Sequence, residues 1–312
     1  MRPPRLLPFA VLAGGVLVVS TASILIRIAQ GGGAPSLTIA AFRLGVAGLI
    51  LMPFALRAAE PTARRDLGLA LVSGAFLAGH FWSWISSLAH TSVASSTALV
   101  TTNPLWVGLA SLLIFRERLG PALLAGIALC VGGAGLIFAS DEGTLSHAPG
   151  GNPSVGNLLA LVGAICASGY LLIGRAVRTR MSLLQYVWLA YSSAALLLWL
   201  AVAGTGAAVL GLAGVAYWCM LGLAVGPQLI GHTAFNWSLR HLSATFVAVS
   251  ILGEPIGSAL LAWFVFDEGL EQLQLLGFVL ILGGIATAAL AERGKTMAQT
   301  SASASAARSN GR

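Results

Sequence analysis

The sequence predicts an all-α integral membrane protein in which ten transmembrane helices form two inverted five-helix repeats around a central cavity. Three observations carry this prediction: the composition, the spacing of the apolar segments and a similarity between the two halves. Of 312 residues, 57% are apolar and 9% are charged, and the mean hydropathy is +0.88. Because a soluble domain has about 25% charged residues, most of this protein's surface is expected to face lipid.

Ten apolar segments, each long enough to cross a bilayer as a helix, follow one another along the chain. They lack the alternation of apolar and polar residues that is typical of a membrane β-barrel, so helices are the structure that satisfies their backbone groups in hydrocarbon. The composition also excludes a secreted disulfide scaffold, a disordered chain and a nucleic-acid-binding protein. The predicted spans are residues 8–28, 36–56, 67–88, 93–114, 121–139, 155–174, 182–203, 213–237, 244–266 and 272–291.

The basic residues predict the orientation of these spans. If the N-terminus is cytoplasmic, fifteen of the seventeen Lys and Arg residues fall on the cytoplasmic side, and the others are Arg27, at the outer edge of the first span, and Arg43, inside the second. Such asymmetry is the positive-inside signature. We therefore expect a multi-pass membrane protein with both termini cytoplasmic. The Ser- and Ala-rich tail over 292–312 is predicted to be disordered.

An internal repeat divides the chain. At an offset of 151 residues, Pro104 falls on Pro255, Glu117 on Glu268, and several Gly, Leu and Phe positions also coincide. The predicted units are a first repeat at 8–140, an outer linker at 141–154 and a second repeat at 155–291. Since each repeat holds five spans, an odd number, the two copies are expected to cross the membrane in opposite senses.

Two pairs of segments carry a resemblance to a known family. The stretches 101–106 with 115–119, and 252–255 with 266–268, resemble the two EamA repeats of the drug/metabolite transporter superfamily, and the chain is similar to its bacterial aromatic amino-acid exporters. The resemblance implies a ten-helix carrier of small molecules with a central cavity. It implies no cofactor, and a monomer is the simplest functional unit. One departure from symmetry is that Asn103 stands in the first repeat where the second has Glu254.

Polar and aromatic stripes in the third and eighth spans predict a substrate site. Phe76, His80 and Trp84 share one face of a helix because they are four residues apart, as do the three residues of the second stripe. Two such faces at related positions are typical of a small-molecule cavity, although a histidine that packs between helices explains either His as well. The second stripe consists of Gln228, His232 and Asn236.

Two charged residues lie deep inside predicted spans. Arg43 is a candidate contact for a substrate carboxylate, or it reaches outward to the interface or bonds carbonyls of the first span. Glu254 is a candidate carrier of a coupled proton, and the alternative is a structural carboxyl tied to backbone carbonyls. Three prolines within spans, Pro104, Pro227 and Pro255, each remove a backbone N–H and predict kinks that either allow rocking or are static.

These features favour a secondary active transporter that exports amino acids, aromatic and hydrophobic ones first, by alternating access, with protons as a candidate coupling ion. The alternatives are an exporter of lipophilic or cationic drugs and a carrier of another metabolite such as a nucleotide sugar, which is expected to need more basic residues in the spans. An intramembrane enzyme is disfavoured because no zinc-helix or nucleophile motif appears. No metal site is predicted.

Overall fold

The computed structural model of the chain describes residues 6–58, 60–103, 105–107, 109–110, 120–141, 151–178, 180–238, 250–251 and 253–287. In this part of the chain every regular element is a helix. The elements are α1 (Leu7–Ser20), α2 (Ala22–Gly31), α3 (Ser36–Arg57), α4 (Arg64–Ser87), α5 (Val93–Val100), α7 (Pro121–Asp141), α8 (Pro153–Val177), α9 (Leu183–Thr205), α10 (Gly214–Leu223), η1 (Ala224–Gly231), α11 (His232–Ser238), α13 (Gly253–Phe266) and a final helix, Gln272–Thr287.

Six helical stretches are long and apolar enough to cross a membrane, and they coincide with six of the ten predicted spans. Shorter apolar helices lie within three more predicted spans, and α5 lies within the predicted span at 93–114, of which the structure describes only a part. The long stretches are Leu7–Gly31, Ser36–Arg57, Arg64–Ser87, Pro153–Gly174, Leu183–Thr205 and Gly214–Phe235, and the shorter ones are Leu124–Ser140, Gly253–Phe266 and Gln272–Thr287.

Helix starts follow from local sequence. The side chains of Ser92, Asn152 and Ser182 accept hydrogen bonds from the backbone N–H three residues later, at distances of 3.1, 3.3 and 3.4 Å. This is the N-cap role that short polar side chains fill, because the first turn of a helix has backbone N–H groups without helical partners. These three residues therefore fix where α5, α8 and α9 begin.

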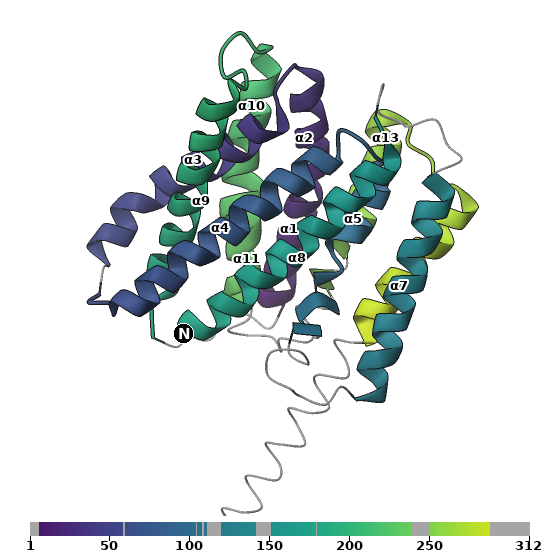
Figure 1. Cartoon of the computed structure of the whole chain (residues 1–312), viewed down its shortest axis with the longest axis horizontal. Helices are drawn as coiled ribbons and strands as arrows, with labels where there is room; N and C mark the ends of the chain where they lie inside the picture. The colour runs from purple at the N-terminus through teal and green to yellow at the C-terminus, as the bar shows by residue number, and fades with distance from the viewer. Residues whose placement is uncertain are drawn as a thin grey trace, which may run out of the picture.

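Small residues let the long helices approach closely, most clearly between α4 and α8, which run side by side across the front of Figure 1. A Cβ on Gly163 would lie 3.4 Å from the Cβ of Trp84, and a Cβ on Gly79 would lie 3.1 Å from the sulfur of Cys166. Since lipid gives no hydrophobic drive for helices to associate, such close backbone packing is a main source of cohesion in a bilayer.

α7 packs against the final helix at the edge of the bundle (Figure 1). A Cβ on Gly133 would lie 2.5 Å from the carbonyl oxygen of Gly277, and a Cβ on Gly277 would lie 2.6 Å from that of Gly133. Gly284 meets the carbonyl oxygen of Gly126 in the same way, at 2.6 Å. Backbones this close leave no room for larger side chains, so these glycines are needed for the contact.

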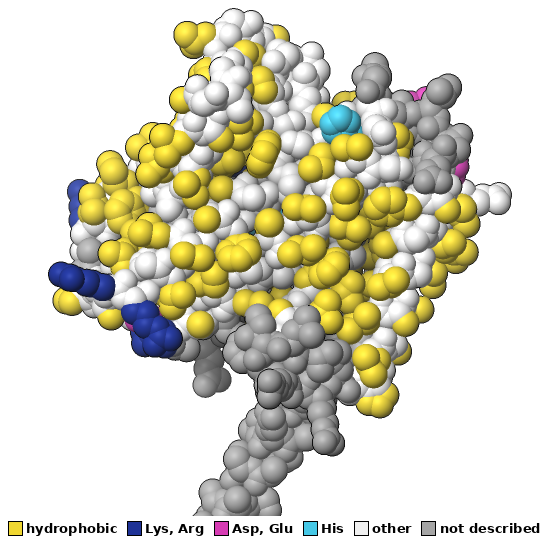
Figure 2. Space-filling view, in the orientation of Figure 1, with side chains coloured by type: hydrophobic (Ala, Val, Ile, Leu, Met, Phe, Trp, Pro, Cys, Tyr) yellow, Lys and Arg dark blue, Asp and Glu magenta, His cyan; other side chains and the backbone are white. Residues whose placement is uncertain are grey.

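The outer surface matches a lipid environment. Figure 2 shows apolar side chains spread over the helices of this face, while the Lys and Arg side chains in view gather at one edge. Large side chains such as Leu200, Trp218 and Phe264 are 60–84% exposed. Exposed apolar surface on this scale is costly in water but neutral in lipid.

The two ends of the bundle carry the polar links. At the end nearer the N-terminus, Arg180 in the turn between α8 and α9 makes a bidentate ion pair with Asp66 at the start of α4, with its Nη2 2.7 Å from Oδ1. The hydrogen bonds that Arg180 donates to the Asp66 carboxylate raise the pKa of Arg180. The side chain of Gln185 adds bonds to Glu60 O and Thr62 Oγ1. These bonds join the α3–α4 connection to the start of α9.

Candidate substrate-binding site

Arg43 lies in the middle of the bundle and is 1% exposed. Its Nε donates to Oε1 of Gln228 at 2.8 Å, and it makes no ion pair with any residue that the structure describes. The guanidinium therefore neither reaches the interface nor bonds the first span, as two of the sequence-based alternatives would require. A buried charge without an ion-pair partner is costly, so its surroundings must stabilise it by other means.

Aromatic rings of α4 supply part of that stabilisation. The Arg43 guanidinium carbon lies 4.3 Å from the ring centroid of Phe81 and 5.9 Å from that of Trp84. A cation over an aromatic face is attracted by the electron-rich ring, by about 2 kcal/mol when the pair is desolvated. Phe81 and Trp84 are both almost fully buried. They form an aromatic wall beside Arg43.

His80 extends this wall by one helical turn. Its ring stacks on Trp84 with centroids 5.9 Å apart and an interplanar angle of 13°, and it meets Phe81 edge-on at 4.7 Å. Its Nδ1 lies 2.9 Å from the carbonyl oxygen of Gly163 on α8. This contact leaves Nε2 as the ring nitrogen that can meet a ligand, while Nδ1 fixes the orientation of the ring.

Gln228 reaches Arg43 from an irregular stretch of backbone. The α10 helix widens into η1, an eight-residue π-helical segment that contains Pro227, before α11 resumes the regular pitch. Pro227 cannot donate a backbone hydrogen bond, which favours such a departure from α-helix. π-Helical segments are frequent at functional sites. Tyr191 of α9 is a buried neighbour that interacts electrostatically with Arg43.

Glu254 and His232 are electrostatic neighbours of this cluster. Both interact electrostatically with Arg43, and His232 also with His80. The backbone oxygen of Glu254, in the first turn of α13, accepts a hydrogen bond from Ser20 Oγ at 3.3 Å. We use the name Arg43 cluster for Arg43, His80, Phe81, Trp84, Tyr191 and Gln228, with Glu254 and His232 as its charged and polar neighbours.

Two buried donors of the cluster have no hydrogen-bond partner among the described residues. They are Nη1 of Arg43 and Nε1 of Trp84. An unsatisfied buried donor costs about 1–3 kcal/mol, and more when it is charged. The two donors belong to neighbouring side chains, since the Arg43 guanidinium carbon lies 5.9 Å from the centroid of the Trp84 ring, and each can donate to an acceptor oxygen of a ligand.

The other residues predicted for the site lie elsewhere or outside the described part of the chain. Phe76 lies over Gly169 of α8 and is 37% exposed, away from the Arg43 cluster. Pro255 is buried near the start of α13. Pro104 and the side chain of Asn236 lie outside the described residues.

Sequence reasoning missed Phe81 and Tyr191. Phe81 is next to His80, but a strict four-residue stripe passes over it, and Tyr191 carries no charge or motif that distinguishes it in an apolar span. The signal that could have found Phe81 is the pairing of an isolated basic residue with nearby aromatic residues.

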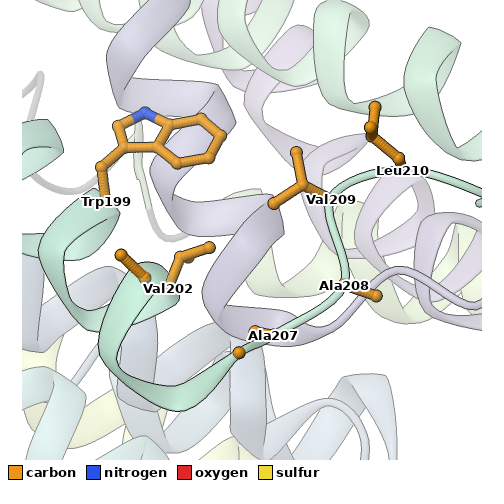
Figure 3. A pocket seen from close by; sticks show the side chains of 8 residues that line it. Trp199, Val202, Ala207, Ala208, Val209 and Leu210 are labelled. Carbon is orange, nitrogen blue, oxygen red and sulfur yellow. The ribbon is translucent and has the colours of Figure 1, made fainter.

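A separate surface pocket lies at the end of α9. Its lining is apolar, and Figure 3 shows the Trp199 indole facing the loop that carries Val209. It contains no group of the Arg43 cluster and no charged residue, so it provides little chemical selectivity. The lining residues are Trp199, Val202, Ala203, Gly206, Ala207, Ala208, Val209 and Leu210.

A helical bundle with several long apolar spans and a buried, partly unsatisfied polar cluster has the features of a multi-pass membrane protein with an internal candidate binding site. The model of the EamA-like transporter family matches residues 7–139 and 154–290. The chain therefore belongs to the EamA-like transporter family, within the drug/metabolite transporter superfamily.

Two individual similarities accompany this match. A protein of Archaeoglobus fulgidus described as an uncharacterized transporter is 26% identical over 271 residues, which cover 86% of this chain and 91% of the relative. A solved structure described only as the crystal structure of a protein aligns with a TM-score of 0.61 at 20% identity, and the alignment covers 91% of this chain and 97% of that one. The second similarity concerns the fold alone.

Proposed function

We propose that this protein is a secondary active transporter that exports amino acids, aromatic and hydrophobic ones first, across a bacterial inner membrane. The observation that carries the proposal is the pair of unsatisfied buried donors, Arg43 Nη1 and Trp84 Nε1. A carboxylate accepts hydrogen bonds from both kinds of group, and its bonds to Arg are among the strongest in proteins. The aromatic wall of His80, Phe81 and Trp84 suits an apolar side chain next to that carboxylate.

Glu254 is the proposed partner for the ammonium group of an amino acid. Its carboxyl interacts electrostatically with Arg43. In its ionised form it would present a negative charge to the ammonium group of a zwitterion whose carboxylate faces Arg43. The same carboxyl is the proposed carrier of a coupled proton. Substrate contacts through Gln228, His232 and Asn236, and a contact of Phe76 with substrates as they enter, belong to the same proposal.

Two sets of contacts support an inverted repeat of five helices in each half. Ser20 Oγ bonds the backbone oxygens of Val16 and Glu254, and Ser168 Oγ bonds those of Ala164 and Asn103. Glu254 and Asn103 are equivalent at the offset of 151 residues, whereas the two serines are 148 residues apart, so a related contact, with the donor shifted by three residues, occurs once from each half.

The glycine contacts between α7 and the final helix also occur once from each half. Gly126 and Gly277 are equivalent at that offset, as are Gly133 and Gly284, and the contacts run from Gly126 to Gly284 and from Gly133 to Gly277. Such reciprocity is the mark of a two-fold relation. In an inverted repeat, alternating access arises when the halves exchange conformations around a fixed site, and Pro104, Pro227 and Pro255 are the proposed points of flexure.

Cationic drugs are the second candidate, because Glu254 and aromatic rings can hold a cation. The buried positive charge of Arg43 argues against it, since a cation placed beside the guanidinium is repelled. A nucleotide sugar carries two phosphates, for which one arginine provides little compensation. An amino acid, which is neutral overall, fits one buried base and one nearby acid better than a cationic drug or a nucleotide sugar does.

The test is counterflow of labelled tryptophan into proteoliposomes preloaded with unlabelled tryptophan. We expect tryptophan and leucine to compete, and tryptamine, which lacks only the carboxylate of tryptophan, to compete at least tenfold less well. Competition by tryptamine and tetraphenylphosphonium without competition by amino acids would favour the cation exporter. Competition by a nucleotide sugar alone would favour that carrier instead. Efflux from tryptophan-loaded cells, with and without the protein, tests the direction.

A further inference from the structure

A buried ion pair closes the bundle at the end away from the N-terminus. Arg27 of α2 and Glu268, which follows α13, are 2.8 Å apart between Nη2 and Oε1, and their side chains are 11% and 5% exposed. The Arg27 guanidinium carbon also lies 5.9 Å from the Phe266 ring. The pair thus joins the first span to the connection between α13 and the final helix.

Both members of the pair also bind the turn between α4 and α5. Arg27 Nη2 donates to the backbone oxygen of Thr91 at 2.8 Å, and Glu268 Oε2 accepts from the backbone N–H of Val93 at 2.9 Å. Val93 is the first residue of α5, so Glu268 satisfies an N–H that has no partner inside its own helix. Glu268 therefore caps a helix that belongs to the other half of the chain.

The final helix holds the same turn from a second side. Nε2 of Gln274 donates to Ser92 Oγ at 2.9 Å and to Ser95 Oγ at 2.7 Å. Asp267, which precedes Glu268, has a φ of +58°, a conformation that turns the backbone sharply and that non-glycine residues adopt only at a cost. Four hydrogen bonds from Arg27, Glu268 and Gln274 therefore converge on residues 91–95.

This closure follows the proposed site along the chain. Trp84 lies three residues before the end of α4 at Ser87, and Thr91 is in the turn that leads from there to α5. We infer that the Arg27–Glu268 pair is the closed gate of the transport path on this face, and that the path opens when the pair releases the α4–α5 turn. The inference rests on the proposed carrier function, because only a protein that alternates between two faces needs such a gate.

The physical character of the pair suits a gate. A buried ion pair offsets its desolvation only when additional hydrogen bonds support both charges. Here Thr91 and Val93 supply one backbone bond to each residue, while Nε of Arg27 has no partner among the described residues. If the turn moves away, each charge loses its partners and regains water instead. Closed and hydrated arrangements are therefore two distinct states, as a switching element requires.

The test measures water access behind the gate. Ser23 is one helical turn before Arg27, is 1% exposed, and its Oγ has no hydrogen-bond partner among the described residues. Ser23→Cys, in a protein whose Cys130, Cys166 and Cys219 are replaced by Ala, would report access to a membrane-impermeant methanethiosulfonate. The full-length protein in nanodiscs exposes both faces to the reagent.

We expect the reporter to react slowly in the parent and at least tenfold faster with Glu268→Gln. Gln can still accept from Val93 N–H, but it no longer neutralises Arg27. Asp66→Asn, which removes the carboxylate of the Asp66–Arg180 pair at the opposite end, is the matched control and should leave the rate unchanged. An equal rate in Glu268→Gln and the parent, at similar melting temperatures, would overturn the inference.

A second variant keeps the gate testable if Glu268→Gln does not fold. Gln274→Met removes two bonds to the α4–α5 turn and leaves the ion pair intact, so we expect a smaller acceleration, about threefold. If Glu268→Gln does not fold, an unchanged rate in Gln274→Met overturns the gate. The labelling needs no substrate, so a gate that opens in a protein without amino-acid counterflow would contradict the proposed substrate while leaving the gate standing.

Discussion

Arg43 and Gln228 are 185 residues apart in the sequence and are joined by a buried hydrogen bond of 2.8 Å from Nε to Oε1. The bond uses one edge of the guanidinium. Because Nη1 has no partner among the described residues, Gln228 fixes the guanidinium in a position that leaves a donor for a ligand. Gln228 is in this sense a positioning residue, and Arg43 is the residue that would contact the substrate.

Arg43→Lys should impair amino-acid transport. A lysine ammonium has no planar pair of donor edges, so it cannot bond Gln228 and a carboxylate in the same geometry. We expect a loss of roughly 2 kcal/mol in binding, about thirtyfold in the concentration for half-maximal counterflow. Arg57→Lys, at the exposed end of the same helix, is the control. Equal half-maximal concentrations in the parent and Arg43→Lys would remove Arg43 from the site.

Trp84→Phe separates the indole donor from the aromatic surface. The ring can still stack on His80, but the Nε1–H is lost, so a neutral hydrogen bond of about 1 kcal/mol should disappear, a fivefold weakening. Trp82→Phe is the matched control, because Trp82 lies on the same helix and is 53% exposed. Competition assays with tryptophan and tryptamine check the result: only tryptophan should weaken, and equal weakening of both would argue for a packing effect.

Glu254→Gln tests proton coupling. If Glu254 carries the coupled proton, the variant should still exchange labelled for unlabelled substrate but should lose accumulation driven by a pH gradient. The measurement is tryptophan flux in proteoliposomes with and without an imposed gradient, compared with the parent. An undiminished response to the gradient would exclude Glu254 as the proton carrier and favour the structural role of its carboxyl.

Gly74→Val should destabilise the bundle without touching the Arg43 cluster. A Cβ at Gly74 would overlap Ser193 Oγ and lie 2.7 Å from the carbonyl oxygen of Ala190 on α9, so the larger side chain forces the helices apart at a cost of roughly 1–3 kcal/mol. Gly68→Ala is the control, since nothing lies within 4 Å of a Cβ there. Thermal unfolding in detergent should show a lower midpoint for Gly74→Val alone.

Part of the site could be predicted from the sequence. His80, Trp84, Arg43 and Gln228 were all expected there, because polar or charged residues in apolar spans are rare and face the interior. Phe81 and Tyr191 could not be distinguished from other apolar residues of their spans. The sequence also could not predict the partners of Arg27 and Glu268. Both side chains bind backbone groups of the α4–α5 turn, and every type of residue offers a backbone oxygen of this kind, so no residue type marks the partner.

The sequence by itself determined that this protein is a helical membrane protein, because composition and segment length depend only on the order of residues. The family followed from the motifs at 101–106 and 252–255, which are also local. Only the tertiary structure decided that Arg43 bonds Gln228 of η1, because a π-helical segment rotates side chains away from the regular helical register. It also decided that Glu268 and Arg27 meet at 2.8 Å. Contacts between distant residues depend on how closely small side chains let the helices pack, which periodicity does not specify.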